Sequence, residues 1–118
     1  WVQVLNLQVE RFDADSVTLR LPQSEQLSRV GGTLCGQAMM AAADTAMVLA
    51  LIHHFGQFRP CSTVQLSSTF MKPLSGQDAL VTARLLRAGK AMAFGEIDLT
   101  GADDGKSVFR ASTTYALM

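Results

Sequence analysis

Residues 31–55 read GGTLCGQAMMAAADTAMVLALIHHF, and this is the one stretch of the chain with the character of a long helix. Strong helix formers dominate it from Gln37 to Phe55, and no Pro or further Gly occurs before Gly56. Apolar residues occupy nearly all of its sides, so we expect a helix buried within one domain or between subunits. Its many alanines would let a sheet wrap closely around it.

The sequence on both sides of this helix has the pattern of strands. A hairpin is predicted before the helix, with strands over 2–12 and 17–21 and a turn between them. Four period-two strands are predicted after it, over 62–71, 79–86, 93–100 and 107–117. Their short connections favour antiparallel neighbours. We therefore expect an α+β fold, a long central helix wrapped by a curved antiparallel sheet of about six strands, in a single domain over residues 1–118.

Composition and charge exclude several classes of protein. Hydrophobic residues make up 48% of the chain, which is enough for a core, and ten basic residues balance ten acidic ones. No run of Lys or Arg indicates a nucleic-acid-binding face. Cys35 and Cys61 show neither zinc-ligand nor disulfide-framework spacing, so we expect a reduced, cytoplasmic protein without metal or cofactor. The apolar run over 38–52 is short for a membrane span and contains Asp44, which favours a soluble protein.

Asp44 is the most informative single residue. It is the only acidic or basic side chain between Arg29 and His53, and it stands in the middle of the apolar helix. A carboxylate without a partner in apolar surroundings costs several kcal/mol, so Asp44 needs either a partner or a chemical role. It is therefore a candidate catalytic carboxylate, or it lies on a solvated stripe or pairs with a distant Arg.

Gly36 is a second candidate, at the predicted start of the helix. Free backbone N–H groups and the positive end of the helix dipole suit an oxyanion there, although an ordinary N-cap or close packing explains a glycine as well. Eight residues separate Gly36 from Asp44, or about 12 Å of helix. One small carbonyl group cannot touch both within one subunit. If both act on it, they come from two antiparallel chains, and the reaction requires a dimer.

Other residues of the helix have ordinary interpretations as well. Cys35 directly precedes Gly36, but no base lies beside it in the sequence, which favours a small buried residue over a nucleophile. Met40 and Met47 fall at helical spacing, so core packing is the default and the lining of an acyl tunnel is the alternative. The two histidines of the last turn are expected to cap the helix end and to lie on the surface.

Together these segments resemble the hotdog-fold acyl-CoA thioesterases of the phenylacetate-degradation (PaaI) type. The resemblance covers essentially the whole chain and rests on the order and spacing of five segments: 31–47, 63–66, 70–73, 84–90 and 111–115. It implies hydrolysis of a medium-chain, long-chain or aryl acyl-CoA to the free acid and CoA. It also implies a homodimer that assembles to a homotetramer.

The resemblance assigns roles to particular residues. Asp44 corresponds to the catalytic acid, which acts as general base or nucleophile, and Gly36 to the oxyanion N–H donor of the opposite subunit. Thr63 corresponds to a hydroxyl group that helps to position the attacking water. Counting back nine residues from Asp44 places Cys35 where the family carries a histidine.

Two further positions depart from the family pattern. Gln37 replaces a glycine, and Arg29 replaces an amide side chain and could pair with Asp44 to hold it ionised. Cations that could bind the CoA phosphates follow later in the chain, and surface charge pairing is the alternative for each: Arg84, Arg87 and Lys90.

Two other functions remain open. The substituted positions Cys35 and Arg29 motivate a non-catalytic protein that binds acyl-CoA or another hydrophobic ligand. A hotdog hydratase or dehydratase is disfavoured, because such enzymes pair a carboxylate with a histidine. The only histidines here begin about two and a half helical turns beyond Asp44.

Overall fold

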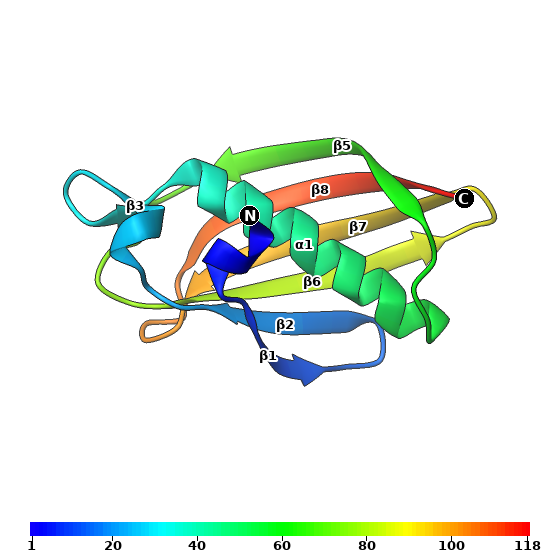
Figure 1. The fold of residues 1–118 in the computed structure, drawn as a ribbon, viewed down its shortest axis with the longest axis horizontal. Coiled ribbons are helices and arrows are strands. Elements are labelled where there is room, and N and C mark those ends of the chain that lie inside the picture. Colours follow the sequence, from blue (N-terminus) through cyan, green and yellow to red (C-terminus); the bar gives the residue numbers. More distant parts are fainter.

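The structure is a computed structural model that describes residues 1–118, and Figure 1 shows its fold. Two 3-10 helices, η1 (Val2–Leu5) and η2 (Glu25–Leu27), accompany one α-helix, α1 (Gly36–Phe55). The strands, in chain order, are β1 (Gln8–Phe12), β2 (Ser16–Leu21), β3 (Ser28–Arg29), β4 (Thr33–Leu34), β5 (Cys61–Phe70), β6 (Ala79–Ala88), β7 (Met92–Gly101) and β8 (Ser107–Leu117).

Six strands form one antiparallel sheet in the order β1-β2-β6-β7-β8-β5. Helix α1 lies across one face of this sheet, and β3 and β4 form a separate small hairpin just before it (Figure 1). The strands β1 and β5 are the two edges. This α+β arrangement of one long helix and six strands is the one that the sequence predicted.

The core lies between α1 and the sheet. Eight α1 side chains are buried there: Ala38, Met39, Ala42, Ala43, Ala46, Met47, Ala50 and Leu51. They meet large apolar side chains of β2, β6, β7 and β8 in one cluster, and each large one that is fully buried stabilises the fold by about 1.5–3 kcal/mol. The 20-residue helix is longer than the apolar run over 38–52 and passes a length-and-composition test for a membrane span, as core helices of soluble proteins do. In this fold, α1 is the core helix.

The distance between α1 and the sheet depends on Gly95 of β7. A Cβ atom at Gly95 would lie 2.5 Å from the Sδ and Cε atoms of Met47 and 2.9 Å from the carbonyl oxygen of Arg84. Such distances are far shorter than van der Waals contact. Met47 itself is fully buried. The Met47 side chain therefore fills the space that a side chain at position 95 would need.

The predicted strand over 2–12 is wrong in its first half. Val2–Leu5 form η1 instead, and Asn6 ends it in the left-handed region with φ 53°, which Asn tolerates better than most residues. Only Leu5 of η1 is buried, and η1 packs on α1. Of these apolar residues, Leu5 packs in the core, and the segment does not pair as a strand.

The β3–β4 hairpin brings the chain to the start of α1. Its turn contains Gly31 and Gly32 with φ of 99° and 81°, values that favour glycine. The Cys35 N–H then bonds the Leu27 carbonyl oxygen at 2.9 Å, which fixes the chain where the helix begins. The segment 23–29 between β2 and this turn contains η2 and the first hairpin strand.

Candidate active site

Asp44 lies half-buried on α1, beside β5 and β8. The Thr63 hydroxyl donates to Oδ1 of Asp44 at 2.8 Å. The Tyr115 hydroxyl lies within hydrogen-bond distance of the same Oδ1 and 2.9 Å from the main-chain carbonyl oxygen of Asp44. No hydrogen bond or ion pair within the chain involves Oδ2. One carboxylate oxygen is held and the other is free.

Strand pairing brings the two hydroxyl groups together. Thr63 of β5 and Tyr115 of β8 are directly opposite in the antiparallel register, so their side chains share the face that α1 covers. The register shifts between Thr63 and Gln65, at a bulge. Bulges commonly redirect side chains near functional sites. Here the strand turns its next residue, Val64, toward solvent, with 58% of it exposed.

Burial and the Asp44 carboxylate control the ionisation of the neighbouring groups. Burial raises the pKa of Tyr115 well above the usual range, and the hydrogen bond to Asp44 adds to the rise. Burial also raises the pKa of the Cys61 thiol, with a smaller contribution from the negative charge of Asp44. Tyr115 therefore remains a protonated donor, and Cys61 remains a thiol rather than a nucleophilic thiolate.

A second group of predicted residues surrounds the start of α1. Four of them line a cavity of about 620 Å³: Arg29, Cys35, Gly36 and Gln37. Phe70 and Lys72, to which the sequence analysis gave no role, line the same cavity. Apolar side chains complete the wall: Leu34, Met39, Met71 and Pro73. The cavity thus has a mixed lining, in which apolar side chains lie beside the cations Arg29 and Lys72.

The backbone at the start of α1 is available to a ligand. Cys35 is the N-cap residue, and no side chain caps the helix. As the first helical residue, Gly36 has no intrahelical acceptor for its N–H. A Cβ atom on Gly36 would lie 3.1 Å from Cε1 of Phe70, so the aromatic ring packs closely over this glycine. The N–H and the helix dipole together suit a negatively charged oxygen.

The structure does not bring Arg29 to Asp44. Arg29 lines the cavity, whereas the partners of the carboxylate are the hydroxyl groups of Thr63 and Tyr115. Arg29 and Asp44 therefore form no pair within one subunit, and a pair between subunits stays a prediction. About two turns of helix separate Asp44 from the helix start that Arg29 adjoins.

The two methionines predicted to contact substrate differ in burial. Met47 is fully buried against Gly95, so core packing, the default interpretation, describes it. Met40 is half-buried and packs on the edge of the core. Met39 is the methionine that reaches the cavity at the helix start.

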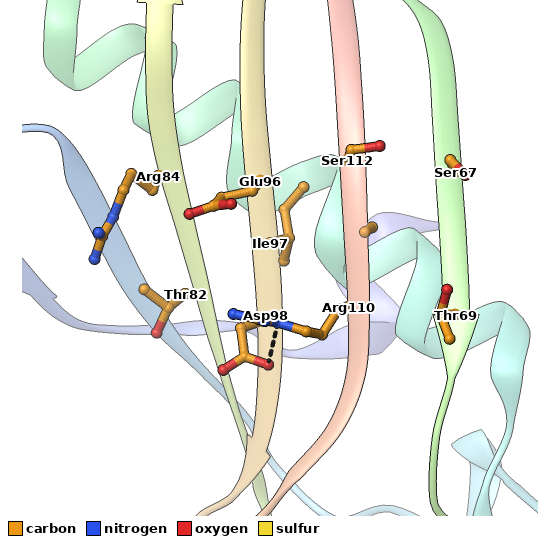
Figure 2. Close-up of a pocket in the computed structure, with 10 residues that line it drawn as sticks. Ser67, Thr69, Thr82, Arg84, Glu96, Ile97, Asp98, Arg110 and Ser112 are labelled. Carbon is orange, nitrogen blue, oxygen red and sulfur yellow. Dashed lines mark ion pairs between the residues drawn. The ribbon is translucent and has the colours of Figure 1, made fainter.

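The three cations predicted to bind phosphate lie away from that cavity in the same chain. Arg84 lines a polar hollow on the face of the sheet opposite α1, with Glu96, Asp98 and Arg110 (Figure 2). Arg87 lies near the end of β6 and Lys90 in the turn that follows. That turn is at the opposite end of the sheet from the start of α1 (Figure 1).

The sequence analysis assigned no role to Tyr115. Its only signals were its place in the closing segment 111–115 and its being the one tyrosine of the chain. Contact with Asp44 depends on the register between β5 and β8 and on the height of α1 above the sheet, which local patterns do not specify.

His53 was expected to cap the helix end. It lies instead with Nε2 2.7 Å from the carbonyl oxygen of Asp13.

Known proteins share both the sequence pattern and the fold. The family model described as Thioesterase superfamily matches residues 31–108. Mouse acyl-coenzyme A thioesterase 13 is 31% identical over 94 residues, which are 79% of this chain and 66% of the relative. The human protein of the same name is 29% identical over 102 residues, covering 86% and 72%.

A solved structure agrees with this relationship. Zebrafish thioesterase superfamily member 2 superposes with a TM-score of 0.87 at 27% identity, covering 95% of this chain and 81% of that one. The predicted hotdog fold and the predicted class of enzyme, a thioester hydrolase, are confirmed. The chain belongs to the thioesterase superfamily.

Proposed function

We propose that this chain hydrolyses acyl-CoA thioesters to the free acid and CoA, as a homodimer in which Asp44 is the catalytic carboxylate. The observation that carries the proposal is the arrangement at Asp44, where two hydroxyl groups hold Oδ1 and Oδ2 is free. A positioned carboxylate with one free oxygen suits a general base or a nucleophile. The names of the relatives support acyl-CoA as the substrate.

In the general-base form of the reaction, Oδ2 of Asp44 takes a proton from water as the water oxygen attacks the thioester carbonyl carbon. The carbonyl oxygen becomes an oxyanion, which the Gly36 N–H at a helix start stabilises. The tetrahedral intermediate then collapses, the C–S bond breaks, and the leaving CoA thiolate takes the proton that Asp44 received from water. In the alternative form, the Asp44 carboxylate attacks the carbonyl carbon, the C–S bond breaks and CoA leaves as the thiolate. Water then hydrolyses the resulting mixed anhydride to the free acid and the regenerated carboxylate.

The positions of Gly36 and Asp44 relative to β5 support the dimer. Gly36 contacts Phe70 at the end of β5, and Asp44 contacts Thr63 near its beginning. If two copies of β5 pair antiparallel with their centre near Leu66, the Phe70 end of each lies beside the Thr63 end of the other. That pairing brings the Gly36 N–H of one subunit toward the Asp44 carboxylate of its partner.

The same β5–β5 pairing supports the cavity at the start of α1 as the site that binds CoA. Arg29 and Lys72 flank the cavity at the start of α1, where cations and a helix N-terminus favour anionic phosphates. The partner's Cys61 end of β5 lies beside this cavity in such a dimer. Arg87 and Lys90 are on that end of the sheet, so they too remain candidates across the dimer. The apolar wall with Met39 and Phe70 suits a medium-chain, long-chain or aryl acyl group.

The test is a panel of acyl-CoA substrates, short to long and aryl, with release of the CoA thiol as the measured quantity. Asp44→Asn removes the base and should lower kcat by about 10²-fold or more, on the substrates that wild type hydrolyses. Asp103→Asn is the matched control, because Asp103 is an exposed turn residue whose carboxylate forms no hydrogen bond in the structure. Wild-type rates in Asp44→Asn would overturn the role of Asp44. No hydrolysis by wild type of any substrate would overturn the proposed function and favour a protein that only binds acyl-CoA.

A further inference from the structure

We propose that Tyr115 is a positioning residue for the reaction. Its hydroxyl group and that of Thr63 hold Oδ1 of Asp44, so that Oδ2 is the oxygen that faces the attacking water. This inference rests on the proposed function and adds to it a residue on the last strand of the sheet. Tyr115 touches neither substrate nor water in this role and acts through Asp44.

The first support is the geometry of the tyrosine. Tyr115 is 1% exposed, and its ring is part of the core beneath α1. Its hydroxyl group lies within reach of two oxygens of the same residue, Oδ1 and the main-chain carbonyl of Asp44. A hydroxyl group carries one proton, so it donates to one of these oxygens at a time. In both cases, the packed ring keeps the donor beside Asp44.

The second support is the freedom that an aspartate otherwise has. Rotation about the terminal bond of an Asp side chain is broad and roughly two-fold, so either carboxylate oxygen can face a given direction. Two donors on the same oxygen oppose this rotation. Thr63 supplies one of these donors from β5, the last strand of the sheet order. Tyr115 supplies a donor from the interior of the sheet.

The third support is that the Tyr115 phenol does not easily lose its proton. Burial, with the adjacent Asp44 carboxylate, raises the pKa of Tyr115 well above its usual value. The phenol therefore remains protonated and continues to donate at neutral pH. The effect of Asp44 on the ionisation of Tyr115 can also be measured, since Tyr115 is the only tyrosine in the chain.

The kinetic test is Tyr115→Phe, which removes one oxygen and keeps the ring in the core. Loss of a hydrogen bond to a charged group corresponds to about a tenfold fall in kcat, with KM unchanged. A wild-type kcat, or a fall in kcat/KM that comes entirely from a raised KM, would overturn the inference.

A matched control separates positioning from stability. Thr113 lies on the same strand, is buried, and donates to the Gln65 carbonyl oxygen at 2.8 Å without touching Asp44. Thr113→Val should lower the melting temperature but leave kcat and KM as in wild type. If Thr113→Val and Tyr115→Phe lower kcat equally, Tyr115 has only a structural role and the inference fails.

A spectroscopic test does not depend on activity. Tyrosinate absorbance reports the ionisation of Tyr115 alone, in wild type and in Asp44→Asn. Tyr115 should ionise at lower pH in Asp44→Asn than in wild type, because the neighbouring negative charge is gone. Identical titrations would show that the two groups do not interact and would overturn the inference. An inactive wild type with a shifted titration would instead reject the proposed function while the contact between Tyr115 and Asp44 stands.

Discussion

The two edges of the sheet are built in opposite ways. The edge strand β1 has five residues, two of them charged, and a shift of register between Val9 and Arg11. Its Glu10 pairs with Arg20 of β2 at 2.7 Å, and Arg20 also pairs with Asp78 at 3.0 Å. The other edge, β5, has ten residues and contains no charged residue and no proline.

This contrast separates a protected edge from an open one. Short length, charges and bulges are the features that keep a sheet edge from pairing with another chain. The strand β1 has all three, while β5 is long and uncharged, with a bulge only near its beginning. Both groups of candidate site residues adjoin β5, since Asp44 contacts Thr63 and Gly36 contacts Phe70. The open edge and the chemistry are on the same side of the molecule, as a shared active site requires.

The largest expected effect comes from charging the open edge. Val64→Lys with Ser67→Lys would place four like charges along the proposed two-fold β5–β5 pair. This should convert the proposed dimer to monomers and lower kcat/KM by about 10²-fold or more. Sedimentation and thiol release measure the two effects. Gln8→Lys with Val9→Lys adds the same charges to β1 and should leave both quantities unchanged. A doubly substituted β5 variant that remains dimeric and active would show that the subunits meet elsewhere.

A second experiment tests which subunit supplies the Asp44 carboxylate and which supplies the Gly36 N–H. Pro is tolerated at the first helical position but has no N–H, so Gly36→Pro removes the oxyanion donor and should cost about 10²–10³ in kcat. Gly36→Ala is the control, because it makes the same close contact with Phe70 and keeps the N–H.

Mixed dimers then decide between the two arrangements. A heterodimer of an Asp44→Asn subunit and a Gly36→Pro subunit contains one intact site if the two groups come from different chains. Purified through two different tags, it should show about half of the wild-type activity, although each homodimer is inactive. Inactive heterodimers would place both groups in the same subunit.

The smallest effect concerns the protected edge. The Gln23 N–H and then Arg20 hold the pKa of Asp78 below its usual value, so the ionised form stabilises the fold. A lowered folded-state pKa gives stability that is present above the unfolded pKa of about 4 and is lost as pH falls through the folded value. Asp78→Asn should therefore lower the melting temperature slightly at pH 7, with little difference from wild type in strong acid. Dimer formation and kcat should not change, and a loss of either would mean that β1 contributes to the site.

The sequence predicted the fold well because the signals that specify it are local. A stretch of about twenty residues without an internal Pro or Gly predicts one helix, and period-two segments with short turns predict antiparallel strands. The first segment was misjudged because Val2, Val4 and Leu5 have the alternation of a strand. Their conformation depends on Asn6 and on a tertiary contact of Leu5 with the core.

The candidate site was predicted only in part, for a related reason. Asp44 stood out because a single carboxylate in an apolar helix is visible in the sequence alone. The role of Tyr115 depends on a pairing with Thr63 across 52 positions of sequence (115 minus 63), which periodicity does not report. The separation of Arg29 from Asp44 within one subunit has the same origin, because a helix of about two turns lies between the two side chains.

The contact between Met47 and Gly95 couples the substitutions that positions 47 and 95 can accept. A protein of this lineage that gains a side chain at position 95 must carry a residue shorter than Met at position 47, or its helix must rise from the sheet. Asp44 lies three residues before Met47 on the same helix, so a raised helix would lift the carboxylate away from Tyr115. Positions 47 and 95 should therefore change together among relatives wherever the carboxylate keeps its tyrosine.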